Sequence, residues 1–261
     1  MRIARYLYER HIHFGIVEDG NIEELEKTPF TGIKSAGRNY PLADVELLTP
    51  AEPSKILAVG LNYQDHAREL GLKTPDEPVL FAKPPSALLP HGGNIVYPRM
   101  SAEVDYEAEL AIIIGDQCRA LTPGEAPAHI LGYTCANDVT ARDLQRLDGQ
   151  WTRAKGFDTF CPLGPYISTD EDVCGRRIEL RLNGQLRQSS STEHMIFSCF
   201  EVVSFVSHVM TLYPGDVILT GTPPGVGQLR VGDEVEIEIE GMDVLRNRVI
   251  AAPGNHEKGF A

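Results

Sequence analysis

The sequence VDYEAELAIIIG, at residues 104–115, is rich in apolar and β-branched residues and ends on a glycine, so it predicts a β-strand. Side chains alternate between the two faces of a strand, so Asp105, Glu107 and Glu109 share one face. That face begins with three carboxylates and then becomes apolar. We therefore expect its acidic end to border a partly buried space, where a divalent cation is one of the few partners that can hold two carboxylates together.

A second acidic stretch provides the alternative interpretation. Residues 234–240 also alternate glutamate with valine or isoleucine, but their polar face is polar along its whole length. That pattern is typical of a strand with one solvated face, which is the commoner arrangement of paired glutamates. Periodicity alone therefore leaves Glu107 and Glu109 open to both interpretations, a solvated face or a metal site.

The composition limits the partners that the protein can have. Its 261 residues are enough for one sizeable domain with a small appendage. The formal net charge of −13 argues against binding to nucleic acid or to an anionic membrane, because both require clusters of Lys and Arg. An anionic small molecule remains a suitable ligand if a metal and a few cations create positive potential locally.

The cysteines and the apolar segments indicate the cellular compartment. The five cysteines form no Cys-x-x-Cys pair, so the sequence predicts reduced core thiols, with neither a disulfide framework nor a cysteine zinc site. The first residues contain no apolar signal segment, and no apolar run approaches the ~18 residues of a membrane helix. A soluble, cytoplasmic protein is the expectation.

The chain is expected to divide near residue 50. The first 50 residues contain two strand-like runs and a turn, which is the pattern of a small β-rich unit. Two prolines within residues 49–53 interrupt any regular element there. We therefore predict a small N-terminal β unit over residues 1–50 and a larger domain over residues 54–261.

A candidate proton-transfer pair follows the first buried strand of the larger domain. Residues 61–71 predict a short helix that ends at Gly71, and helical spacing puts His66 and Glu69 on neighbouring positions of one face. A glutamate beside a histidine raises the basicity of the imidazole and fixes its orientation, as a general base requires. Surface pairs with this spacing are common, so the pair alone does not establish a catalytic role.

A third candidate carboxylate lies after the acidic strand. Residues 130–136 predict a buried strand, and a helix should follow from about Ala141, with Thr140 and Asp143 in the spacing of a capping box. Asp138 then lies in the loop before the helix. A carboxylate at this strand exit is well placed to complete a site that the strand glutamates begin.

Lys155 falls in residues 151–165, which are dense in Gly, Pro and aromatic residues and predict an ordered loop. It can support a ligand site or be an ordinary surface lysine. The rest of the chain predicts strands over residues 177–182, 217–220 and 234–239, a hairpin turn at Asn183-Gly184, and an amphipathic helix over residues 198–212.

The absence of several motifs narrows the chemistry. The glycine-rich loop 221–227 lacks the Lys-Ser/Thr ending of a phosphate loop and the spacing of a dinucleotide site. Neither a G-x-S-x-G elbow nor an H-E-x-x-H motif occurs. The loop suits a rigid wall that offers backbone N–H groups and the Thr222 hydroxyl to a ligand.

Six motifs together resemble the fumarylacetoacetate hydrolase superfamily. They occur in order over about residues 54–250: G-L-N-Y-x-D-H-x-x-E from Gly60, F-x-K-P from Phe81, D-Y-E-x-E-L from Asp105, N-D-x-T-x-R-D from Asn137, K-G-F-D from Lys155 and T-G-T-P-x-G-V-G from Thr220. The first 50 residues are similar to the N-terminal unit of bacterial 2-hydroxyhepta-2,4-diene-1,7-dioate isomerases. This resemblance favours the metal interpretation of the acidic strand.

The resemblance implies a β-rich α+β fold, a mixed β-roll, which is usually dimeric, so we expect a homodimer. It implies an Mg²⁺ or Mn²⁺ site formed by Glu107, Glu109 and Asp138, and hard carboxylate ligands suit these ions. Asp105, on the same strand face, receives no role. The implied catalytic residues are His66, Glu69 and Lys155, and the candidates for holding the substrate are Arg142, Gln145 and Thr222.

The chemistry that the resemblance implies passes through a metal-stabilised enolate of an anionic 2-oxo acid. The favoured function is isomerisation or C–C bond hydrolysis of an unsaturated 2-oxo or 2-hydroxy-dienoic dicarboxylic acid in aromatic-compound catabolism. Oxaloacetate decarboxylation or tautomerisation is the alternative within the superfamily. A non-catalytic, metal-dependent 2-oxo acid binding protein is the alternative from another class, although a binder would not need the proton-transfer pair His66 and Glu69.

Overall fold

The computed structural model describes residues 1–69, 71–169 and 172–254. Its strands are β1 Arg2–Tyr8, β2 His11–Glu18, β3 Asn21–Leu25, β4 Ser35–Pro41, β5 Glu46–Leu47, β6 Ile56–Val59, β7 Leu80–Lys83, β8 Leu88–Leu89, β9 Asn94–Tyr97, β10 Val104–Tyr106, β11 Ala108–Ile114, β12 Ile130–Asn137, β13 Thr140–Ala141, β14 Cys161–Ser168, β15 Arg177–Leu182, β16 Gln185–Ser191, β17 Val217–Leu219, β18 Gly227–Gln228, β19 Glu234–Ile239 and β20 Leu245–Ala251. Its α-helices are α1 Gln64–Glu69, α2 Arg142–Asp148, α3 Thr152–Lys155 and α4 Cys199–Val209.

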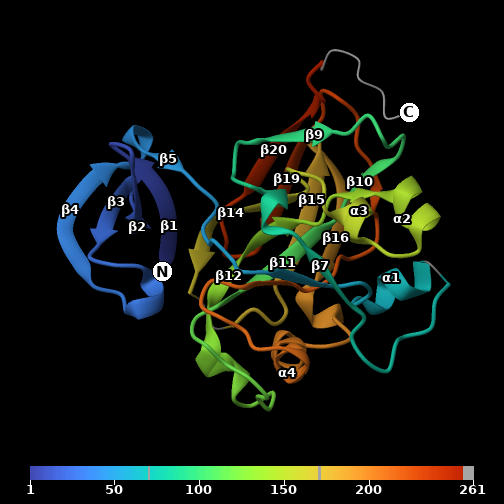
Figure 1. Ribbon diagram of the computed structural model, residues 1–261, viewed down its shortest axis with the longest axis horizontal. Helices are drawn as coiled ribbons and strands as arrows, with labels where there is room; N and C mark the ends of the chain where they lie inside the picture. The colour runs from blue at the N-terminus through green and yellow to red at the C-terminus, as the bar shows by residue number, and fades with distance from the viewer. Residues whose placement is uncertain (70, 170–171, 255–261) are drawn as a thin grey trace.

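The strands form three sheets in the described part of the chain. A 12-stranded sheet has the order β4-β3-β2-β1-β14-β12-β11-β17-β6-β7, with β5 beside β1 and β8 beside β14. A five-stranded sheet has the order β16-β15-β19-β20-β9, and a three-stranded sheet the order β13-β10-β18. Figure 1 shows the N-terminal strands at one end of the molecule and α1, α2 and α3 at the other. The predicted β-rich α+β fold is therefore confirmed.

The large sheet continues from the N-terminal strands into the main body. The connection is the antiparallel pair β1 and β14, where Arg2 lies opposite Ser168 and Ile3 opposite Ile167. Ile3 and Ile167 are both fully buried and belong to the same core cluster. Apolar packing and backbone hydrogen bonds therefore both join the first strand to the sheet that carries the acidic stretch.

The acidic stretch is divided between two sheets, whereas the sequence predicted one continuous strand. β10 pairs with β13 and β18 in the small sheet, while β11 pairs with β12 and β17 in the large one. Glu107 lies at the transition, and its backbone N–H donates to the side chain of Asn137 at 2.9 Å. Every residue of β11 is buried. The expectation that the acidic end borders a buried space is therefore confirmed.

The second acidic stretch has the solvated face that its pattern predicted. In β19 the residues Val235, Ile237 and Ile239 are buried, and the intervening glutamates are partly exposed. The hairpin between β15 and β16 turns at Asn183 and Gly184, whose φ angles are +53° and +74°. Asn-Gly suits such a turn because both residues tolerate positive φ.

The helices agree with the sequence in some details and differ in others. α4 begins with the capping box that Ser198 and Glu201 form, and its buried residues confirm the predicted amphipathic helix. α2 begins within one residue of its predicted start, but the predicted capping box is wrong. The Thr140 hydroxyl donates to the carbonyl of Asp138 at 2.9 Å, and Asp143 accepts a hydrogen bond from Ser101 at 2.6 Å.

The prediction of a loop over residues 151–165 is also wrong, because this segment contains α3 and the first part of β14.

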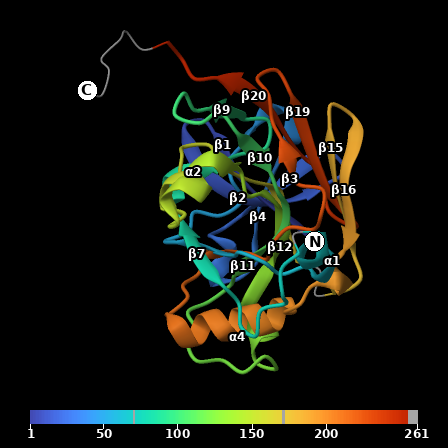
Figure 2. The same cartoon turned by 90° about the vertical axis from the view of Figure 1, so that its right-hand side faces the viewer.

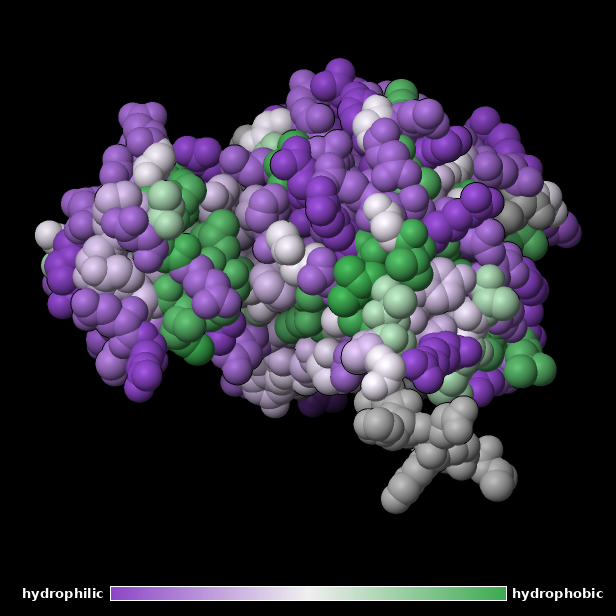
Figure 3. All heavy atoms as spheres, turned by 90° about the horizontal axis from the view of Figure 1, so that it is seen from above, coloured by the Kyte–Doolittle hydropathy of each residue, from purple (hydrophilic) through white to green (hydrophobic). Residues whose placement is uncertain are grey.

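In both Figure 1 and Figure 2, α4 lies at the opposite end of the main body from β9 and β20. No helix of the described residues is long and apolar enough to cross a lipid bilayer. Figure 3 shows a largely hydrophilic face on which hydrophobic side chains gather in a few separate patches.

Candidate functional site

A cavity of about 340 Å³ brings together nearly all of the predicted site residues. The predicted residues in its lining are His66, Glu107, Glu109, Asp138, Arg142, Gln145, Lys155 and Thr222. Glu69 does not line the cavity but hydrogen-bonds to His66. The lining also contains side chains to which the sequence assigned no role: Val59, Leu72, Phe81, Arg146 and Trp151.

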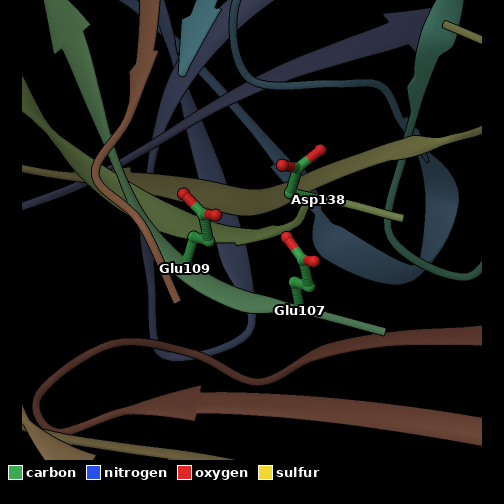
Figure 4. Close-up of side chains that lie close together, drawn as sticks. All are labelled: Glu107, Glu109 and Asp138. Atoms are coloured by element: carbon green, nitrogen blue, oxygen red, sulfur yellow. The ribbon is translucent and has the colours of Figure 1, made fainter. Parts of the chain in front are cut away.

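The carboxylates of Glu107, Glu109 and Asp138, here called the acidic trio, point toward one another (Figure 4). Glu107 precedes β11, Glu109 is its second residue, and Asp138 follows β12. The antiparallel register places Ala108 opposite Asn137, and the backbone N–H of Asp138 donates to the carbonyl of Glu107 at 2.9 Å. One oxygen from each member of the trio lies within 4.8 Å of the others.

Lys155 lies between two members of the acidic trio. Its ammonium donates to Glu107 Oε2 at 2.8 Å and to Asp138 Oδ2, and only 2% of the residue is exposed. Burial alone would lower the pKa of Lys155, but the two carboxylates outweigh burial and raise it. Lys155 is therefore a buried, charged ammonium rather than the surface lysine that the sequence left open.

A second buried lysine, Lys83, contacts one member of the acidic trio, Asp138. Its ammonium donates to Asp138 Oδ1 at 2.5 Å and to the carbonyl of Val139 at 3.1 Å, and 1% of the residue is exposed. The sequence analysis assigned Lys83 no role. Its place in the F-x-K-P motif was the available signal.

The members of the acidic trio differ in their electrostatic environment. Burial would raise the pKa of Glu107, but the positive charges of Lys155 and Arg142 lower it to about 2. For Glu109, burial and the negative charges of Asp138 and Glu107 hold the pKa well above its ordinary value. Glu109 accepts the backbone N–H of Gly221 at 2.6 Å, and it has no salt bridge to any residue in the described ranges.

Arg142 connects the acidic trio to α2 and explains Asp105. Its Nε donates to Asp105 Oδ2 at 2.8 Å, one terminal nitrogen donates to Gln145 Oε1 at 2.6 Å, and the other donates to Glu107. All three guanidinium nitrogens therefore have acceptors within the protein. Asp105, which received no role from the sequence, neutralises and orients Arg142.

His66 and Glu69 form the pair that helical spacing predicted. His66 Nδ1 lies 2.8 Å from Glu69 Oε2, and Glu69 Oε1 accepts the backbone N–H of Gly225 at 3.2 Å. A carboxylate at Nδ1 favours the tautomer that carries its proton there, which leaves Nε2 as an acceptor. The glycine-rich loop thus orients Glu69, and Glu69 orients the imidazole on the cavity wall.

Thr222 is held by a residue that sequence reasoning missed. The Gln188 amide donates to the Thr222 hydroxyl at 2.9 Å and to the carbonyl of Pro223 at 2.8 Å, while its oxygen accepts the backbone N–H of Ala108 at 2.9 Å. Gln188 lies in β16 and is fully buried. No local pattern distinguishes it from the other polar residues of that strand.

The acidic trio fits a hard divalent cation. Carboxylate oxygens are the ligands that Mg²⁺ and Mn²⁺ prefer. Three oxygens within 4.8 Å of one another are close enough to converge on one small divalent cation, whose ligands lie about 2.0–2.1 Å from it in the case of Mg²⁺. Glu109 in addition forms no ion pair in the described part of the chain, and burial and the neighbouring carboxylates disfavour its charged form, which a bound cation would favour.

Comparison with known proteins identifies the family. The fumarylacetoacetate (FAA) hydrolase C-terminal family matches residues 55–250, and a family described as Rv2993c-like, N-terminal, matches residues 1–50. The structure is similar to that of a 2-hydroxyhepta-2,4-diene-1,7-dioate isomerase from Mycobacterium marinum, with a TM-score of 0.90 and 43% identity over 96% of this chain and 98% of that one.

Two further relatives extend the range of activities. A mitochondrial oxaloacetate tautomerase of Bos taurus is 46% identical over 223 residues, which cover 80% of this chain and 71% of that protein. The structure of a maleylpyruvate hydrolase from Sphingobium sp. SYK-6 in complex with manganese(II) and pyruvate has a TM-score of 0.81 and 30% identity over 97% of this chain and 100% of that one. The chain therefore belongs to the fumarylacetoacetate hydrolase family and is an enzyme.

Proposed function

We propose that this enzyme depends on a divalent metal and isomerises or hydrolyses unsaturated 2-oxo or 2-hydroxy-dienoic dicarboxylic acids. The observation that carries the proposal is the convergence, in one cavity, of the acidic trio with Lys155 and with the oriented His66. Glu107, Glu109 and Asp138 would hold Mg²⁺ or Mn²⁺. The bound ion would supply positive charge that stabilises the negative charge developing on the 2-oxo oxygen of the substrate.

Lys155 adds a hydrogen-bond donor beside the same oxygen. An ammonium has three hydrogens, and Glu107 and Asp138 accept two of them. The third remains for a substrate oxygen. Because Lys155 is buried and held by two charged acceptors, it is positioned before substrate binds and needs no reorganisation during the reaction.

Gln145 and Thr222 have donors that face no protein acceptor within the described ranges. Arg142 donates to the Gln145 oxygen, which leaves the amide hydrogens of Gln145 for substrate. Gln188 donates to the Thr222 oxygen, which leaves the hydroxyl hydrogen of Thr222. We therefore assign the binding of the substrate carboxylate to these two groups, with Arg142 as the residue that positions Gln145.

His66 is proposed to transfer the proton. Glu69 accepts a hydrogen bond from the protonated Nδ1, so Nε2 can remove a proton from a substrate carbon or from an attacking water. Glu69 also stabilises the imidazolium that this transfer produces. The same pair can return the proton to a different carbon, which would give isomerisation, or leave hydroxide to attack a carbonyl, which would give hydrolysis.

A second candidate function is keto–enol tautomerisation of oxaloacetate. It is favoured by the 46% identity to the bovine oxaloacetate tautomerase over 80% of this chain. The reaction needs the same stabilisation of the 2-oxo oxygen and the same proton transfer, without cleavage of a C–C bond. Substrate choice therefore distinguishes the two candidates.

The test is an activity screen over a panel of 2-oxo dicarboxylic acids that includes oxaloacetate. Metal-free enzyme should be inactive, and Mn²⁺ or Mg²⁺ should restore turnover; turnover that persists in chelator would contradict the proposal. Glu109→Gln should abolish restoration by metal. Glu238→Gln, a matched substitution on the partly exposed face of β19, should not.

A further inference from the structure

The inference concerns the substrate class and rests on the proposed function. The cavity has a buried end and an exposed end. Glu109, Asp138 and Lys155 are each at most 2% exposed and form the end called the floor. Leu72 is 56% exposed, the Arg146 side chain is 62% exposed, and both line the same cavity, so they form its mouth. A 2-oxo acid bound at the floor directs the rest of its carbon chain toward the mouth.

The cavity also has an aromatic wall. Phe81 and Trp151 contribute to its lining, and their rings meet edge to face with centroids 5.2 Å apart. Gly60 allows this arrangement, because a Cβ atom at that position would approach the Trp151 ring to 2.8 Å. Phe81 also lies beside the floor, with the Lys155 ammonium 5.0 Å from its ring centroid, so the carbon chain of a substrate that leaves the floor would pack against this aromatic wall.

Two arginines on one face of α2 have different tasks. Arg142 and Arg146 are four residues apart, which places them side by side on a helix. Arg142 is fully engaged with Asp105, Gln145 and Glu107. Arg146 has only Glu103 as a side-chain acceptor in the described chain, through a contact of 3.3 Å and a second, shorter one. It is the cation at the mouth that can change partners.

We propose that Arg146 binds the distal carboxylate of a long-chain dicarboxylic 2-oxo acid, and thereby selects diacids over monoacids of equal length. Replacing Glu103 by a substrate carboxylate as the partner of Arg146 costs little free energy, because an exposed pair such as Arg146 and Glu103 contributes little to stability. A substrate carboxylate offers the guanidinium the same bidentate geometry that Glu103 does. Arg146 is therefore a specificity residue at the end of the cavity opposite the reacting atoms.

The test compares the binding of two acids that differ only at the distal end. We would measure the affinities of 2-oxoheptanedioate and 2-oxoheptanoate for the full chain with Mn²⁺ by titration calorimetry. Neither acid has the second carbonyl group that C–C cleavage needs, so neither should be cleaved during the titration. Wild type should bind the diacid about fivefold more tightly, which corresponds to about 1 kcal/mol. Arg146→Gln should remove this preference and leave the affinity for the monoacid unchanged.

Arg153→Gln is the matched control. Arg153 forms a comparable exposed pair with Asp148, with an Nε to Oδ2 distance of 2.8 Å, and is not among the cavity-lining residues of the described chain. It should keep the full preference for the diacid. Equal losses in both arginine variants would indicate a general effect of net charge and would overturn the proposal.

The remaining outcomes separate the inference from the proposed function. If wild type binds both acids equally, the role of Arg146 is wrong and the proposed function stands. If neither acid binds with Mn²⁺ present, the proposed function fails and the inference fails with it. Glu103→Gln keeps Arg146 and removes its competitor, so affinity for the diacid should stay equal or rise. A fivefold fall in that variant would refute the assignment even if Arg146→Gln did not fold.

Discussion

Replacing Lys83 by methionine removes a charge from the interior of the molecule, since only 1% of Lys83 is exposed. Methionine has a similar unbranched shape, so the packing of the alkyl chain is largely retained. What disappears is the ammonium that donates to Asp138 Oδ1 at 2.5 Å and to the carbonyl of Val139 at 3.1 Å. Because only 1% of Lys83 and 1% of Asp138 is exposed, bulk water has little access to the position of the lost donor.

The magnitude follows from what remains around Asp138. Removing one partner of a buried ion pair destabilises a protein by about 3–5 kcal/mol. Here Lys155 still donates to the other oxygen of Asp138, so the carboxylate keeps one cation. We therefore expect Lys83→Met to lower the free energy of unfolding of the metal-free protein by about 3 kcal/mol, at the lower end of that range.

Lys55→Met is the matched control. Lys55 also pairs with a fully buried carboxylate, that of Asp216, but its side chain is 22% exposed. Asp216 in addition accepts the backbone N–H groups of Ser54, Lys55 and Tyr213 and the hydroxyl of Ser54. With these donors in place, losing the ammonium should lower the free energy of unfolding by only about 1 kcal/mol.

Equilibrium urea unfolding with chelator present measures both variants, and an unchanged slope with denaturant establishes that the unfolded states are comparable. The double variant Lys83→Met, Asp138→Asn should be more stable than Lys83→Met alone, because it no longer buries an undercompensated charge. If Lys83→Met were no less stable than Lys55→Met, or if the second substitution added to the loss, Lys83 would not be compensating Asp138.

Three further predictions concern other parts of the molecule. His66→Gln should lower kcat at least about 100-fold and leave the calorimetric affinity for Mn²⁺ unchanged, whereas a parallel loss of affinity would contradict a proton-transfer role. Arg38 holds the pKa of Glu24 below its ordinary value of 4.5, so Glu24→Gln should destabilise the protein by about 1 kcal/mol at pH 7. The difference in free energy of unfolding between wild type and Glu24→Gln should shrink as the pH falls below 4.5 and through the lowered pKa of Glu24. Urea titrations at several pH values measure this difference, and a difference that did not change with pH would show that the pairing is unimportant. Gly221→Ala should cost about 2 kcal/mol more than Gly232→Ala in urea unfolding, because both have positive φ but only the first would bring a Cβ within 2.8 Å of a neighbour.

Much of the secondary structure could be predicted because its signals are local. The alternation in residues 234–239 and the Asn183-Gly184 turn each depend on a few consecutive side chains, and both are confirmed. The capping box at Thr140 and Asp143 was wrong for the opposite reason. Asp143 accepts a hydrogen bond from Ser101, which is 42 residues away, and a rule based on local spacing cannot predict such a partner.

Some residues of the candidate site could likewise be predicted from the sequence, and others could not. Periodicity alone did not distinguish a solvated face from a metal site for Glu107 and Glu109. The motifs that occur in the order of the family favoured the metal site. Neither source assigned a partner to Asp105 or a role to Lys83. Their partners are separated from them by 37 and 55 residues, respectively, so the pairs exist only once the sheets have formed.

The sequence by itself determined several of the strands, the hairpin turn at Asn183-Gly184, and which residue types are available for catalysis. These properties depend on the two-residue period of a strand and on the conformational preferences of single residues. The tertiary structure alone decided where the acidic stretch breaks between two sheets. That break aims the carboxylate of Glu107 toward Lys155 and Arg142, while Glu109 forms no ion pair within the described ranges. The physical reason is that charge compensation inside a protein is a property of distances, and strand register, not proximity in the chain, sets those distances.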